Sequence, residues 1–200
     1  YPADDFTDAT NDCGTKISNK VVHLLGFNET VEVDSTVTTG TRIICRLSPS
    51  LPQNYQRSLI ISSGSVVTIT SVEFEGAGIR VKDSSTVLTL SGVSFRRMEG
   101  GVGVGGDGYG SAIDVSSGGR AAMTLGTSVS SSSSSFGGAA SARSGSTLDL
   151  CGVTMESNIA SVEGGAIYVN DSTVVVTPGT SGGSMSCSAM TSLLSNKAPL

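Results

Sequence analysis

The strongest constraint in this sequence is a six-residue pattern that recurs every 27 residues. Three copies align without gaps, and their fourth residues are Ile113, Ala140 and Ile167, so the separation is 27 residues both times. An earlier copy has Ile79 in the fourth place, and the longer gap after it coincides with a glycine-rich insertion around Gly100–Gly108. The four copies read GAGIRV at 76–81, GSAIDV at 110–115, GGAASA at 137–142 and GGAIYV at 164–169. A fixed period with one loop-sized insertion is typical of a solenoid, in which each repeat packs against its neighbours.

A second short segment follows each copy, and a third follows the first three copies. Both alternate apolar and polar residues between Gly, Ser or Asp, which predicts strands. Three strands per repeat predict an all-β fold, a right-handed single-stranded parallel β-helix of about six or seven rungs and about 30 Å length. Stacked rungs place equivalent residues above one another, so we expect two interior columns. They are Ile79, Ile113, Ala140 and Ile167, and Leu90, Leu125, Leu150 and Val176.

The pattern divides the chain into three parts. Residues 58–178 carry the β-helix repeats. Residues 1–57 are less regular, with an expected excursion loop at Leu47–Arg57, and we interpret them as an N-terminal cap with the first irregular rungs. Residues 179–200 show no clear rung and are interpreted as a C-terminal cap or tail. Because the chain begins at Tyr1 without a methionine, we expect a processed or excised portion of a longer product.

Composition limits the partners. The formal net charge of -5 provides no basic surface for nucleic acid. No stretch is long and apolar enough to span a membrane. Aromatic residues are 4% of the chain and there are 26 glycines, which favours a core of small aliphatic side chains and many tight turns.

The cysteines and two sequons indicate an oxidising compartment. Cys13, Cys45, Cys151 and Cys187 form an even set without a CxxC pair, a spacing that favours disulfides over zinc. Three pairings are possible, and we expect Cys13–Cys45 and Cys151–Cys187 because local partners need the least rearrangement. Asn28 and Asn170 begin N-glycosylation sequons. We therefore predict a secreted glycoprotein, extracellular or at the cell surface.

The serine run at Ser130–Ser135 allows two interpretations. We expect a polar loop at this place in the repeat, and the alternative is a site of O-glycosylation, which exposed serine-rich tracts often receive.

The sequence predicts no catalytic, cofactor or metal site. Many parallel β-helices cleave acidic polysaccharides, so a lyase or hydrolase of the pectate-lyase-like class is the alternative function. Such a hydrolase needs paired acid and base carboxylates, and their motifs are missing from the repeat region. A lyase needs an arginine base with several acidic calcium ligands on one face. The candidates are Arg80, Asp83, Glu99, Asp107 and Asp114, and their positions do not repeat in a way that gathers three carboxylates. The one histidine, His23, argues against most histidine-dependent mechanisms.

Two tetrapeptides carry a family resemblance. Gly164–Ile167 reads GGAI, and Met155–Asn158 reads MESN, close to an FxxN motif, whereas Phe95–Met98 lacks the asparagine. Over roughly residues 60–176 the chain resembles the β-helical passenger domains of chlamydial polymorphic membrane proteins, with a pectin-lyase-like superfamily fold. The resemblance implies a surface-displayed, non-catalytic β-helix used in adhesion or in building an external structure.

We therefore predict an extracellular structural or adhesive module that is not an enzyme and could be the protomer of a surface filament or appendage. Its expected partners are further copies of itself, end to end or side by side, other surface proteins or glycans, with no cofactor. The two ends of the fold distinguish a monomeric adhesin from a filament protomer. A closed polar cap favours the adhesin, and an exposed rung favours end-to-end assembly.

Overall fold

The computed structural model describes residues 21–24, 30–32, 42–45, 58–61, 64, 66–70, 73–75, 78–98, 108–177, 187 and 190–199. Within these residues the fold is all-β, with parallel strands and no helix. Sheet A contains, in spatial order, β1 (Val21–Leu24), β3 (Arg42–Cys45), β6 (Glu73–Glu75), β9 (Ser94–Arg96), β12 (Ser128–Ser130), β16 (Thr154–Glu156) and β20 (Ser192–Leu194). Sheet B contains β2 (Thr30–Glu32), β4 (Ser58–Ile61), β7 (Gly78–Val81), β10 (Ile113–Val115), β14 (Ala140–Arg143) and β18 (Ile167–Asn170). Sheet C contains β5 (Val66–Thr70), β8 (Val87–Ser91), β11 (Arg120–Met123), β15 (Thr147–Leu150) and β19 (Thr173–Val176), and sheet D contains β13 (Ser133–Phe136) and β17 (Ile159–Glu163).

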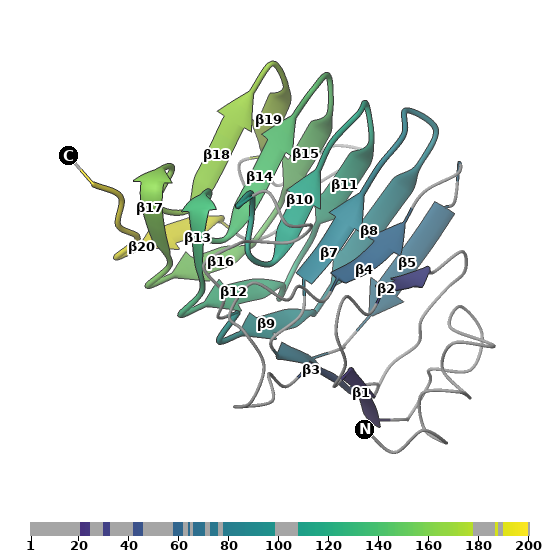
Figure 1. Ribbon diagram of the computed structural model, residues 1–200, viewed down its shortest axis with the longest axis horizontal. Helices are drawn as coiled ribbons and strands as arrows, with labels where there is room; N and C mark the ends of the chain where they lie inside the picture. Colours follow the sequence, from purple (N-terminus) through teal and green to yellow (C-terminus); the bar gives the residue numbers. More distant parts are fainter. Residues whose placement is uncertain are drawn as a thin grey trace.

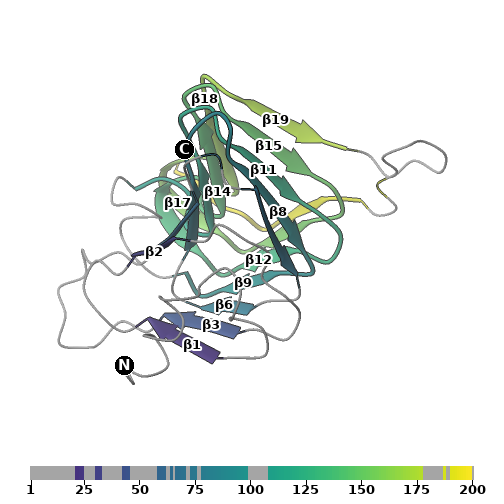
Figure 2. The same cartoon turned by 90° about the vertical axis from the view of Figure 1, so that its right-hand side faces the viewer.

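From β4 onward the chain visits the sheets in a fixed order. It passes from sheet B to sheet C to sheet A and then returns to sheet B, and two of the returns from sheet A pass through β13 or β17 of sheet D. In each sheet a strand pairs in parallel with the equivalent strand of the next repeat, as β7 does with β10 and β10 with β14. Figure 1 shows the repeats side by side from blue to yellow-green, and Figure 2 shows sheet A as a separate layer below the strands of sheets B and C.

The strand register confirms the first interior column. Ile79, Ile113, Ala140 and Ile167 are direct partners in sheet B. The second column was wrong at one position, because Leu90 and Leu150 are joined by Met123 and not by Leu125. Met123 is fully buried, whereas Leu125 lies beyond the end of β11 and is 41% exposed. A shift of two residues preserves the apolar–polar alternation, so the alternation alone could not distinguish these registers, whereas the 27-residue spacing from Leu150 agrees with Met123.

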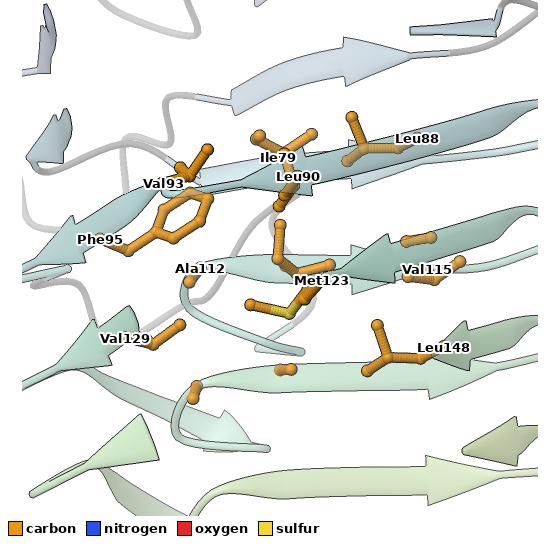
Figure 3. Close-up of a cluster of buried hydrophobic side chains, with 14 of the residues drawn as sticks. Ile79, Leu88, Leu90, Val93, Phe95, Ala112, Val115, Met123, Val129 and Leu148 are labelled. Carbon is orange, nitrogen blue, oxygen red and sulfur yellow. The ribbon is translucent and has the colours of Figure 1, made fainter. Parts of the chain in front are cut away.

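The core lies between the three large sheets. Its side chains project inward from alternate positions, as in β8, where Leu88 and Leu90 are buried and their neighbours are half-exposed. Figure 3 shows such residues from successive repeats pointing into one interior. The ring of Phe95 also stacks on that of Phe74, with the centroids 4.8 Å apart. Each fully buried large apolar side chain contributes about 1.5–3 kcal/mol relative to exposure. The stack of short strands is thus held by one continuous apolar core.

The GGA motif forms the corner before β14 and before β18, and the related GSA forms the corner before β10. Gly137 has a φ of +70°, and a Cβ there would lie 2.0 Å from the carbonyl oxygen of Ala140. A Cβ on Gly138 would lie 2.2 Å from the carbonyl oxygen of Gly165 in the next repeat. The first glycine is therefore required by the backbone conformation and its close approach, and the second by repeat-to-repeat packing. Ala139 is fully buried behind them.

The MESN motif forms the corner after sheet A. The fully buried Asn158 accepts a hydrogen bond from the backbone N–H of Ser132 and donates from Nδ2 to the carbonyl of Val129, 3.1 Å each. Asn196 repeats this role one repeat later, donating to the carbonyl of Met155 and accepting from Asn158 Nδ2. These amides satisfy backbone groups where the sheet pairing ends.

The serine run is mainly strand, which corrects the expected loop. It spans the end of β12 and most of β13, and the two strands are separated by Ser131, whose φ is +53°, and by Ser132. Ser132 and Ser134 are buried, and Ser134 Oγ donates to the carbonyl of Gly137. The hydroxyls at this corner serve buried backbone groups.

The strands of sheet D also account for the length of the repeat. Ile69 pairs with Leu90, 21 positions later in the sequence. In the repeats that contain β13 or β17, paired residues are 26 or 27 positions apart.

The segment after 178 contains a further strand that the pattern did not reveal. β20 pairs in parallel with β16, placing Leu193 opposite Met155, and Lys197 bridges to Ile159. Leu193–Asn196 reads LLSN, a copy of the MESN motif with Leu in the first place. A disulfide joins Cys151 to Cys187, with the Cα atoms 5.4 Å apart, and ties the approach to β20 to the preceding repeat.

Candidate functional site

The outer face of sheet B carries a group of polar side chains that hydrogen-bond to one another. Arg80, Asp114 and Ser141 are register partners in β7, β10 and β14, at positions between the inward-facing residues. All three are buried although they project away from the core. With Arg143 at the end of β14, they form what we call the outer polar cluster.

Asp114 lies at the centre of the outer polar cluster. Its side chain is fully buried, and its Oδ2 accepts from Arg80 Nε at 2.8 Å and from Arg143 Nη2 at 3.0 Å. Its Oδ1 accepts from Arg143 Nε at 3.0 Å and from Ser141 Oγ at 2.7 Å. Two arginines and one serine thereby occupy the acceptor sites of one carboxylate, and the Arg143 contact is bidentate.

Three aromatic rings lie beside this cluster. Tyr109 stacks on Phe136 with centroids 4.9 Å apart, and Tyr168 lies 5.6 Å from Tyr109 and 5.1 Å from Phe136. The guanidinium carbon of Arg143 is 4.2 Å from the centroid of Tyr109, within the range of a cation–π contact. We call Tyr109, Phe136 and Tyr168 the aromatic cluster. Through Tyr109, this cluster contacts the guanidinium of Arg143.

This geometry is that of a cross-link between repeats. A carboxylate that accepts four hydrogen bonds offers no free lone pair to a substrate proton or to a cation. The attraction between Asp114 and its two guanidiniums is strong because burial removes competing water. The outer polar cluster therefore joins β7, β10 and β14 independently of the apolar core.

The residues considered for a calcium site are only partly placed. Arg80 and Asp114 are brought together, as an ion pair and not around a cation. Asp83 is exposed in the turn after β7, with a φ of +76°. Glu99 and Asp107 lie outside the described residues. Among the described residues, no group of three or more His, Cys, Asp or Glu side chains could hold a metal ion.

The residues predicted to form disulfides or to carry glycans are also only partly within the described residues. Cys151 and Cys187 form the disulfide, and Asn170 lies exposed at the end of β18. Cys13 and Asn28 lie outside the described residues, as do the side chains of Cys45 and His23, although their backbones belong to β3 and β1. In the serine run, Ser131 is exposed and Ser132 and Ser134 are buried, so O-glycosylation of the whole run does not fit this fold.

Sequence reasoning missed five of the seven members of the two clusters, namely Ser141, Arg143, Tyr109, Phe136 and Tyr168. The 27-residue period could have placed Ser141 opposite Asp114 and Tyr168 opposite Ser141, because these positions follow the repeat. The same spacing separates Tyr109 from Phe136, and the two residues pair across neighbouring repeats. Nothing periodic identifies the reach of Arg143 back to Asp114.

Comparisons with known proteins return nothing, since no protein-family model, no curated protein and no solved structure matches this chain. Among the described residues, no helix has the length and apolar character needed to cross a membrane.

Proposed function

We propose that this chain is a structural or adhesive module of an extracellular surface, folded as a right-handed parallel β-helix of the pectin-lyase-like type and acting without catalysis. The fixed order of parallel sheets supports the solenoid, and the strong preference of parallel crossovers for right-handed connections supports its hand. The GGAI and MESN corners support the likeness to polymorphic membrane protein passengers. The Cys151–Cys187 disulfide supports an oxidising, extracellular location.

The observation that carries the assembly role is the open last repeat. The inward positions Val169, Val176 and Leu193 are 47%, 49% and 49% exposed, whereas their register partners Ala142, Leu150 and Met155 are all 0% exposed. Their strands are the last in sheets B, C and A in the part of the chain that is described. Among the described residues, this end therefore presents apolar side chains together with strand edges that have no further partner strand.

A second copy would fit this end. All pairings in the three large sheets are parallel, and β1, β2 and β5 form the opposite edges of the same sheets. The last strands of one copy can thus pair with the first strands of another without reversing direction. Such a head-to-tail contact does not close on itself, so repetition produces a filament.

Electron microscopy with two neighbouring variants tests this role. The secreted chain should form rods that lengthen into filaments as its concentration rises. Val176→Lys should abolish the filaments because it places a charge on the inward side of the last repeat. Val175→Lys, on the outward side of the same strand, should leave them intact. Isolated short rods at every concentration of the unmodified chain would contradict filament formation.

The enzyme alternative has a separate test. Incubation with pectic and alginate-like polymers should release neither unsaturated nor reducing ends, and sustained release would overturn the non-catalytic role. Loss of turnover on replacing Asp114 would not identify a catalytic residue by itself, because that carboxylate also holds the fold. Arg80→Lys with an unchanged unfolding midpoint is the informative variant.

A further inference from the structure

Tyr168 and Asn170 form a pair on the outer face of β18. They are two residues apart on one strand and therefore project to the same side of the sheet. Asn170 Nδ2 donates to Tyr168 Oη at 3.0 Å, so the ring extends along the strand toward the amide. Asn170 is exposed, and it begins the sequon Asn170-Asp171-Ser172.

The ring of Tyr168 is held in place by the aromatic cluster. Phe136 and Tyr109 contact it, with centroids 5.1 and 5.6 Å away, and they stack on each other beneath Arg143. Tyr168 nevertheless stays partly exposed. The protein thus presents a fixed, partly exposed aromatic ring directly beside the side-chain amide of the sequon. A sugar attached to that amide could pack on the ring with little further ordering of the side chains.

We propose that Asn170 carries an N-linked glycan whose first sugar packs on the ring of Tyr168. This inference rests on the proposed extracellular role, because the glycosyl donor is a lipid-linked diphospho-oligosaccharide of the secretory route. In the transfer, Nδ2 loses a proton and bonds to the anomeric carbon of the donor, while the bond from that carbon to the diphosphate oxygen breaks. The lipid diphosphate leaves with the bonding electron pair.

The linked amide is suited to both contacts at once. After transfer, Nδ2 keeps one hydrogen and can still donate to Tyr168 Oη. An N-acetylhexosamine on that nitrogen presents the C–H face of its ring, which covers an aromatic face favourably. In the folded protein, the Ser172 hydroxyl accepts from the backbone N–H of Ser146 at 3.1 Å. We therefore place the transfer before this repeat folds, while the sequon is still open to the enzyme.

The test uses the full chain secreted from eukaryotic cells, with Asn28→Gln throughout so that Asn170 is the remaining N-x-S/T site. Mass spectrometry of the Asn170 peptide should show the glycan, and Asn170→Gln should remove it. The glycosylated protein should melt about 2–4 °C above the Asn170→Gln protein, a shift expected from one interaction of ordinary strength in a chain of this length. Trimming the glycan enzymatically to its first sugar should preserve that gain.

Two replacements of Tyr168 separate the ring contact from a general effect of the glycan. Tyr168→Phe should keep the gain in melting temperature and Tyr168→Val should remove it. Each gain is measured against Asn170→Gln in the same background, so any loss of stability from the replacement cancels. An unmodified Asn170, or an equal gain with valine at 168, would overturn the inference. If the glycan inference fails but the Asn170→Gln protein still forms filaments, the proposed assembly role is unaffected.

Discussion

At the scale of single residues, the buried carboxylate of Asp114 holds three strands of sheet B together. Removing one partner of a buried ion pair costs about 3–5 kcal/mol, because the remaining charges lose their compensation. We expect Asp114→Ala to lower the free energy of unfolding by about that amount in urea titrations. Asp149→Ala, at a half-exposed outward position of β15, should change it by about 0.5 kcal/mol or less. Equal losses from both would contradict the cross-linking role of Asp114.

Two glycines with similar backbone angles allow a second residue-scale test. Gly137 and Gly145 have φ values of +70° and +75°, but only Gly137 has atoms within 4 Å of an added Cβ. Gly145→Ala should cost about 1–2 kcal/mol from backbone strain alone. Gly137→Ala should cost at least about twice as much, because the Cβ also meets the Ala140 carbonyl. Denaturant midpoints measure both, and indistinguishable values would mean that the corner is less crowded than described.

At the scale of the strand, the register of β11 is the most informative element. Met123→Ala should cost about 2–5 kcal/mol, as expected for a large side chain removed from a packed core. Leu125→Ala, beyond the strand end, should cost less than about 0.5 kcal/mol. The two variants differ by two positions in one apolar–polar pattern, so thermal or urea unfolding distinguishes the registers directly. A larger loss at Leu125 would support the alignment expected from the sequence alone.

The same strand shows how far the sequence could lead. The 27-residue spacing correctly placed Ile113, Ala140 and Ile167 in one column, because adjacent repeats of equal length leave no freedom in register. Counted back from Leu150, the same spacing gives Met123, the observed partner. The expectation of Leu125 followed the apolar–polar alternation instead, which a two-residue shift leaves unchanged. The sequence pattern also missed β20 and β13. A long insertion hides the first, and the serines of the second serve buried backbone groups in place of an apolar pattern.

At the scale of the whole molecule, one disulfide fastens the last described repeat to the one before it. Cys151 and Cys187 are 36 residues apart, and closing a loop of that length stabilises a fold by about 3–4 kcal/mol in the chain-entropy account. Cys151→Ala with Cys187→Ala should lower the unfolding free energy by about this amount, and a reducing agent should do the same to the unmodified chain. Unchanged midpoints in both experiments would show that the bond does not hold this end.

The central claim is that the chain passes repeatedly through three parallel sheets and pairs with itself one repeat later. A crystal structure of the secreted chain tests it most directly. It should show Ile79, Ile113, Ala140 and Ile167 stacked in one inward column, with neighbouring strands about 4.8 Å apart and Asp114 on the outer face. Antiparallel pairing between these strands, or a one-residue shift that turns Asp114 into the core, would contradict the account.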